Sequence, residues 1–265
     1  MKVFISVDIE GITTTTTWDE TDSSHSSFAL HAKQMTNEVL ACIDGLRSAG
    51  AKEIVVRDAH AYATNIDPTL MPAGVSLIRG YTGHPYNMVE GVDDSFDAAV
   101  FVGYHSSAGR CGNPMSHIRS LKCSYVKING VIASEFLVYS YACALEGVPT
   151  VFLSGDKMLC DDFKDLHPKL ITCPVKDGCG GMTKNYSTVD TLQSIKDLSE
   201  KALSQDLNDA LIKLPKHFDV ELCYKDHSQA QRVLYYPGVV KKSDCIITFE
   251  SDCYYEVVQT LMWIM

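Results

Sequence analysis

The chain has 265 residues, 46% of them hydrophobic and 21% charged, an ordinary globular composition with enough length for a large core. Its 33 acidic and 23 basic residues give a formal net charge of −10. This charge disfavours nucleic acids and anionic membranes as partners, because both bind basic surfaces.

The N-terminal segment lacks the long apolar core of a secretory signal, and no run approaches the roughly 20 apolar residues of a membrane helix. We therefore expect a cytoplasmic protein. The ten cysteines are scattered without any Cys-x-x-Cys pair. This favours free thiols in a reducing compartment over a disulfide framework or a thiolate metal site.

The first half of the sequence alternates between strand and helix patterns. Apolar spacing predicts a helix from Phe28 to Ala49, which begins after Ser26 or Ser27 and stops at Gly50. Its buried face is predicted to hold Leu30, Met35, Val39, Leu40, Ile43 and Leu46. Short β-branched and aromatic runs predict buried strands over 2–7, 53–58, 75–80 and 98–105. Strands and helices in this order predict an α/β fold, with a mainly parallel central sheet and helices on both faces.

The second half has a different texture. Asn129-Gly130 lies between two β-rich runs and predicts a β-hairpin inserted into the α/β unit. Further patterns predict a helix over 134–146, a strand over 149–156, a helix over 187–206, strands over 218–225 and 245–251, and a final helix.

The simplest organisation is a single α/β domain over 1–265, with a smaller C-terminal subdomain from about residue 187 as the alternative. The apolar C-terminal sequence LMWIM is expected either to dock on the chain's own core or to lie in a subunit contact.

Residues of the kinds that bind metals follow several predicted strands at their carboxyl ends. They are Asp8 and Glu10, Asp58 and His60, His105, and Glu135 at the end of the hairpin's return strand. Open parallel sheets bind ligands outside the carboxyl ends of their strands, so these side chains are expected to converge. Residues i and i+2 of an extended segment share a face, so each of the first two pairs is predicted to aim together.

Mixed carboxylate and imidazole groups suit zinc or manganese. Asp8, Glu10, His60, His105 and Glu135 exceed the three protein ligands of one catalytic zinc and fit two metals roughly 3.5–4 Å apart. Other interpretations stay open, because carboxylates after a strand also cap loops and a lone histidine is often structural. Asp58 either holds its loop or orients His60. The repetition at four strand ends favours a metal site.

Two further segments lie near the predicted centre. His117, on the loop after His105, is either a general acid/base or oxyanion partner, or an exposed loop histidine. The run from Thr13 to Thr17 predicts an extended segment at the rim of the site, whose hydroxyls either bind substrate or only shape the loop.

The ordered motifs SVDIEGI (6–12), DAH (58–60), GYH (103–105), MSH (115–117) and SE (134–135) resemble the zinc D-aminopeptidases of the dipeptide-permease operon type. The resemblance implies two Zn²⁺ ions, with Mn²⁺ or Co²⁺ as alternatives, and Asp8 as the bridging ligand. Glu10 and His105 would complete one site, and His60 and Glu135 the other. The family pattern also implies a homo-oligomer built from rings, such as a decamer.

His117 matches the family's catalytic histidine, with nucleophile, general base and transition-state stabiliser as its alternative roles. The expected function is a two-zinc aminopeptidase that removes the N-terminal residue of short peptides, including peptides of D-amino acids. One rival is a two-metal phosphoesterase in which Arg57 or Arg110 holds the phosphate. The other is a non-catalytic zinc- or peptide-binding protein linked to peptide uptake.

Overall fold

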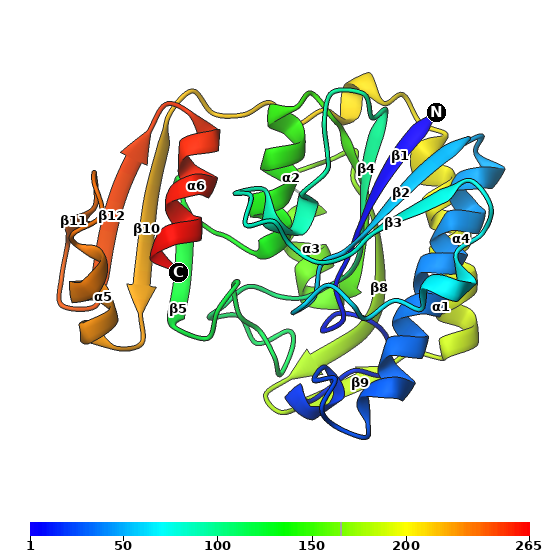
Figure 1. The fold of residues 1–265 in the computed structure, drawn as a ribbon, viewed down its shortest axis with the longest axis horizontal. Helices are drawn as coiled ribbons and strands as arrows, with labels where there is room; N and C mark the ends of the chain where they lie inside the picture. The colour runs from blue at the N-terminus through cyan, green and yellow to red at the C-terminus, as the bar shows by residue number, and fades with distance from the viewer. Residues whose placement is uncertain (165) are drawn as a thin grey trace.

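Two β-sheets lie on opposite sides of a group of helices in the computed structural model, which describes residues 1–164 and 166–265 (Figure 1). The larger sheet has seven strands in the order β3-β2-β1-β4-β7-β8-β9. All its neighbouring pairs are parallel except β8 and β9. The strands are β1 (Lys2–Val7), β2 (Glu53–Asp58), β3 (Val75–Ile78), β4 (Ala98–Tyr104), β7 (Thr150–Asp156), β8 (Ile171–Cys179) and β9 (Met182–Asn185).

Helices cover both faces of this sheet, because neighbouring residues of its strands point in opposite directions. On one face, α1 (Phe28–Ser48) and α4 (Thr188–Leu203) pack against each other and over the side chains of Ile5 and Val100. On the other, α2 (Glu135–Leu145) and α3 (Lys157–Lys164) pack over Phe101 and Leu153. The predicted α/β fold with a mainly parallel, doubly covered sheet is confirmed.

Helix α1 begins after Ser27 as predicted, and Met35, Val39, Ile43 and Leu46 are fully buried. Leu30 was predicted on the same face and is instead 68% exposed. It lies five residues before Met35, which turns it about 140° around the helix axis away from the buried face.

The smaller sheet has five antiparallel strands in the order β11-β12-β10-β5-β6. They are β5 (Cys123–Ile128), β6 (Val131–Ile132), β10 (Phe218–Tyr224), β11 (Val240–Lys241) and β12 (Ile246–Ser251). The predicted hairpin is β5–β6, and its turn residues Asn129 and Gly130 have φ values of +50° and +80°. The hairpin does not stand alone, because β10, more than 90 residues further along the chain, pairs with β5.

Helix α6 (Tyr254–Ile264) connects the two sheets by packing against α2 and against β10 and β12. The C-terminal sequence LMWIM falls largely on this helix, where Leu261 and Ile264 are buried in the chain's own core and Trp263 stays 66% exposed. The remaining elements are α5 (His227–Val233) and helical turns at Trp18–Glu20, Pro68–Leu70, Asn87–Val89 and Asn208–Ala210.

Two expectations from composition concern the whole chain. The ten cysteines are free, as the sequence predicts. Among the described residues, no helix is both long enough and apolar enough to cross a membrane.

Candidate metal centre

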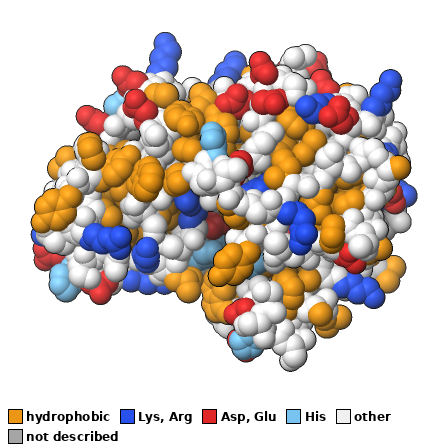
Figure 2. Space-filling model, viewed as in Figure 1, with side chains coloured by type: hydrophobic (Ala, Val, Ile, Leu, Met, Phe, Trp, Pro, Cys, Tyr) orange, Lys and Arg blue, Asp and Glu red, His pale blue; other side chains and the backbone are white. Residues whose placement is uncertain are grey.

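The predicted site residues meet at the carboxyl edge of the parallel strands. Asp8, Glu10, His60, His117 and Glu135 line a cleft of about 460 Å³. His105 lies beneath it and stacks on His117, with ring centroids 4.4 Å apart and planes within 9° of each other. In the space-filling view the molecule is hollowed between its two halves, with histidine and acidic atoms at the bottom of the hollow (Figure 2).

Two glycines let the ends of β1 and β4 touch. A Cβ on Gly11 would lie 1.8 Å from the carbonyl oxygen of Tyr104, and one on Gly103 would lie 2.3 Å from that of Asp8. Gly103 also has a φ of +73°, which favours glycine. The backbone N–H of Gly11 donates to the carbonyl of Gly103 at 2.8 Å. This contact brings the carboxylates after β1 next to His105 after β4.

Asp58 does not point into the cleft. Its carboxylate accepts hydrogen bonds from the backbone N–H groups of Asn65 and Ile66 at 2.6 and 2.8 Å, and from the Asn65 side chain at 2.7 Å. The prediction that Asp58 and His60 aim together is therefore wrong. Strand β2 ends at Asp58, and Ala61 already has a φ of +49°, so the alternation of an extended strand no longer applies. Asp58 holds the loop that carries His60.

Glu135 begins helix α2 rather than ending a strand, contrary to the expected hairpin boundary. Ser134 caps the helix by accepting a hydrogen bond from the N–H of Leu137 at 3.1 Å. The Glu135 carboxylate accepts one from the backbone N–H of Arg119 at 2.5 Å. The first turn of a helix favours a negative charge, so the fold itself stabilises this carboxylate at the cleft.

Asp8 lies between His60 and His105, with one oxygen toward each. Its Oδ1 is 3.4 Å from His60 Nδ1, and its Oδ2 is 3.5 Å from His105 Nε2. Glu10 Oε2 is 3.0 Å from His60 Nδ1, and Glu135 Oε2 is 3.2 Å from His105 Nε2. Asp8, Glu10 and His105 each offer a ligand atom within 4.8 Å of one another, as do His105, His117 and Glu135. This arrangement fits a carboxylate shared by two cations.

The ring nitrogens that face away from the carboxylates contact backbone carbonyls. His60 Nε2 is 3.0 Å from the carbonyl of Thr21, and His105 Nδ1 is 2.9 Å from that of Ser106. A carbonyl only accepts hydrogen bonds, so both nitrogens carry protons. The opposite nitrogen of each ring is then left to bind a metal, and such carbonyl contacts typically hold a ligating histidine in orientation.

Three buried atoms at the centre have no hydrogen-bond partner within the described chain: Asp8 Oδ2, Glu10 Oε2 and His105 Nε2. Their ion-pair contacts of 3.0–3.5 Å do not replace hydrogen bonds, which buried polar atoms normally make, and a cation among them would satisfy all three. The site therefore fits a metal centre by its own chemistry.

In the absence of a metal, protonated histidines and ionised carboxylates stabilise one another at this site. Burial alone would lower the pKa of His105, but the charges of Glu135 and Asp8 raise it to about 10. Burial likewise opposes the charge of Glu135, yet His105 and His117 bring its pKa down to about 2. Metal ligands must be deprotonated, so metal binding here would release protons.

The backbone carbonyl of Glu10 is held by two side chains. Lys176 Nζ donates to it at 2.5 Å and to the carbonyl of Thr15 at 2.5 Å, while Asn113 Nδ2 donates at 2.9 Å. Lys176 is completely buried in β8, and this burial lowers its pKa to about 8. Lys176 and Asn113 therefore fix the peptide that carries Glu10.

Several residues of the cleft had no signal in the sequence. Trp18 packs edge-on against His117 with centroids 5.2 Å apart, and Tyr81 and Arg119 also line the cleft. The threonine run contributes no cleft residue and contacts the β8–β9 region instead, where Thr16 Oγ1 meets Thr183 Oγ1 at 2.5 Å. These contacts support the expectation that the threonine run shapes its loop rather than binds substrate.

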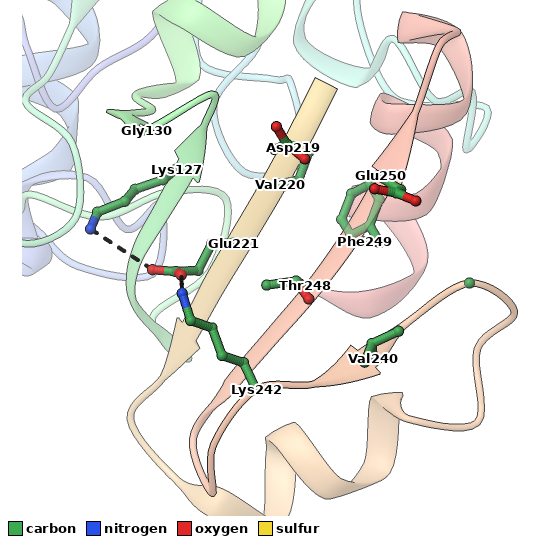
Figure 3. Close-up of a pocket in the computed structure, with 11 residues that line it drawn as sticks. Lys127, Gly130, Asp219, Val220, Glu221, Val240, Lys242, Thr248, Phe249 and Glu250 are labelled. Carbon is green, nitrogen blue, oxygen red and sulfur yellow. Dashed lines mark hydrogen bonds and ion pairs between the residues drawn. The ribbon is translucent and has the colours of Figure 1, made fainter. Parts of the chain in front are cut away.

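A larger cavity, of about 550 Å³, lies over the five-stranded sheet (Figure 3). Its central carboxylate, Glu221, pairs with Lys127 at 3.8 Å and with Lys242 at 2.5 Å. Two lysines therefore pair with Glu221, whereas buried atoms at the carboxyl edge of the parallel strands lack a hydrogen bond among the described residues. We therefore place the chemistry in the smaller cleft.

Comparisons with known proteins identify the family of this chain. A D-aminopeptidase of Bacillus subtilis (strain 168) is 28% identical over 269 positions, which cover 99% of this chain and 96% of the relative. A solved structure, the Zn-dependent D-aminopeptidase DppA from Bacillus subtilis, described as a self-compartmentalizing protease, superposes with a TM-score of 0.92. It is 25% identical, and the match covers all of this chain and 96% of that one. A model of the D-aminopeptidase family, peptidase M55, matches residues 1–263, so the chain belongs to the D-aminopeptidase family.

Proposed function

We propose that this chain is a two-zinc aminopeptidase that removes the N-terminal residue of short peptides, including peptides of D-amino acids. The observation that carries the proposal is that three buried atoms without a hydrogen bond, Asp8 Oδ2, Glu10 Oε2 and His105 Nε2, belong to side chains that offer ligand atoms within 4.8 Å of one another. Zinc is supported by the Zn-dependent relative of the same fold and by the mixed carboxylate and imidazole groups.

The proposed ligands follow the family resemblance, with Asp8 as the shared carboxylate, Glu10 and His105 at one ion, and His60 and Glu135 at the other. Asp8, Glu10 and His105 offer ligand atoms within 4.8 Å of one another, and His60 and Glu135 line the same cleft. When bound, the zinc ions supply Lewis acidity that polarises a peptide carbonyl and lowers the pKa of water.

His117 is proposed to move the proton. Its Nδ1 donates to the carbonyl of Met115 at 2.9 Å, which leaves Nε2 as the basic nitrogen, 3.5 Å from Glu135 Oε1. Burial and the neighbouring His105 lower the pKa of His117, so its imidazole is mostly neutral near pH 7. A neutral, oriented imidazole suits a general base that later returns the proton to the leaving amine.

The phosphoesterase alternative loses the two arginines that were expected to hold the phosphate. The guanidinium of Arg57 is buried and donates to the carbonyl of Gly80 at 2.5 Å, and Arg110 pairs with Asp162. Neither residue lines the cleft. A non-catalytic binding protein is disfavoured by membership of a peptidase family.

We further propose a single cytoplasmic α/β domain that assembles into a homo-oligomer, with a ring-based decamer as the form the family resemblance implies. The self-compartmentalizing relative and the exposed Trp263 on α6 support assembly.

The test begins with metal analysis of the purified protein, where two zinc ions per chain are expected. Glu10→Ala and His60→Ala should each lose zinc and lose hydrolysis of dipeptides, because each removes a ligand. Glu53→Ala and His227→Ala change the same residue types at exposed positions and should retain both. If Glu10→Ala or His60→Ala keeps full zinc content and full activity, the ligand assignment is wrong.

A further inference from the structure

Arg119 is the one arginine or lysine among the described residues that line the cleft, which it shares with the carboxylates of Asp8, Glu10 and Glu135. Within the described chain its guanidinium makes no hydrogen bond, and it lies beyond the 4.0 Å ion-pair distance from all three carboxylates. The cleft therefore holds a guanidinium that no group of the described residues satisfies. Other arginines of this chain, such as Arg57 and Arg110, are engaged by carbonyls or carboxylates.

The backbone of Arg119 is fixed beside the metal centre. Its N–H donates to Glu135 Oε1 at 2.5 Å, and its φ of +54° lies in the left-handed region that non-glycine residues rarely adopt. Such conformations persist only where the surroundings hold them, and they cluster at functional sites. The Cα of Arg119, from which the side chain extends, is therefore held next to Glu135, a proposed zinc ligand.

A guanidinium is shaped to bind a carboxylate through two parallel hydrogen bonds. The one carboxylate present in every unmodified peptide is the C-terminal one. In a dipeptide it lies a single residue beyond the bond to be cleaved, and an extended chain advances only about 3.3–3.6 Å per residue. An arginine anchored at the centre spans that distance, whereas the carboxylate of a longer peptide lies further away with each added residue.

We propose that Arg119 binds the C-terminal carboxylate of a dipeptide whose scissile carbonyl faces the metal centre, and that it thereby selects dipeptides with a free carboxylate. This proposal rests on the aminopeptidase function proposed above. Arg119 is a specificity-determining residue in it, and takes no part in bond cleavage.

The experiment compares a dipeptide with its own C-terminal amide, in the L and D series, using zinc-loaded protein of measured metal content. The measured quantity is the ratio of kcat/KM for the free acid to kcat/KM for the amide. A charge-assisted pair predicts a ratio of roughly 10 to 100 in the wild type. Arg119→Gln should bring the ratio close to 1, and Arg119→Lys should restore part of it.

Arg79→Gln is the matched control, because Arg79 is an exposed arginine outside the cleft and its replacement removes the same charge. Its ratio should equal that of the wild type. A wild-type ratio near 1, or a ratio that Arg119→Gln leaves unchanged, overturns the proposal while leaving the aminopeptidase function intact. If both Arg119 variants lose zinc, the wild-type ratio decides alone.

Failure of the underlying function has a different signature. In that case the zinc-loaded wild type would cleave neither the dipeptides nor their amides, and the proposal would fall with it. p-Nitrophenyl phosphate completes the set, because turnover of this ester that depends on Arg119 would assign the guanidinium to phosphate and overturn the carboxylate proposal.

Discussion

Glu38 should make the free energy of unfolding depend on pH, and a single isosteric substitution should remove this dependence. It is fully buried in α1, where its Oε1 accepts from the N–H of Thr13 at 2.9 Å and from Gln34 Nε2 at 3.1 Å. Its Oε2 has no partner among the described residues. Burial raises the pKa of Glu38 from 4.5 to about 7, and only part of this effect is offset by these hydrogen bonds.

The sign of the stability change follows from this pKa. The folded chain holds the Glu38 proton more tightly than the unfolded chain, so stability is fully present below pH 4.5 and falls as the pH rises through 7. A difference of about 2.5 pKa units corresponds to roughly 3 kcal/mol once the carboxyl is ionised. Glu38→Gln keeps the accepting oxygen and removes the ionisation.

The assay is guanidinium unfolding at pH 5 and pH 8.5, on metal-free protein to separate this effect from zinc binding. Glu38→Gln should exceed the wild type by less than about 1 kcal/mol at pH 5 and by roughly 3 kcal/mol at pH 8.5. Glu53→Gln makes the same charge change on an exposed side chain and should track the wild type at both pH values. A Glu38→Gln curve that runs parallel to the wild type across this range would refute the reasoning.

Three further outcomes are expected. Lys176→Met should weaken zinc binding about 10- to 100-fold in competition with a chelator, because it releases the carbonyl of Glu10. Lys184→Met changes an exposed lysine and should leave zinc affinity unchanged. Equal affinities of the two variants would contradict the role of Lys176. Gly11→Ala should lower the free energy of unfolding by about 3 kcal/mol or more in guanidinium, because its Cβ has no room, whereas Gly181→Ala meets open space and should change little. Trp263→Asp should reduce the mass measured by light scattering if α6 lies in a subunit contact, and an unchanged oligomer would remove this helix from the interface.

The strands and the proposed ligands could be predicted from sequence for one physical reason. Buried parallel strands are short apolar runs, and Asp8, Glu10 and His105 stand out where those runs stop. The convergence of these residues then follows from sheet geometry alone. The i, i+2 argument failed at His60 because it assumed that β2 continued beyond Asp58.

Other parts of the fold carried no such pattern. Strand β8 contains Pro174, Lys176 and Asp177, so it does not resemble a buried strand until the partners of Lys176 are known. Helix α3 has only eight residues, too few for a helical period to be distinguished. Trp18 reaches the cleft from a single helical turn and Arg119 from a loop, and the positions of such short segments depend on tertiary contacts rather than on local sequence.

The contact between Gly11 and Gly103 has a consequence for how the protein acquires its metals. The backbone there, not the ions, sets how far the carboxylates after β1 stand from the imidazole after β4. The entropy of gathering these groups is therefore spent when the chain folds, before any zinc arrives. A chain made in a zinc-poor cell would therefore fold with these ligands already close together. It would bind zinc without refolding once zinc became available.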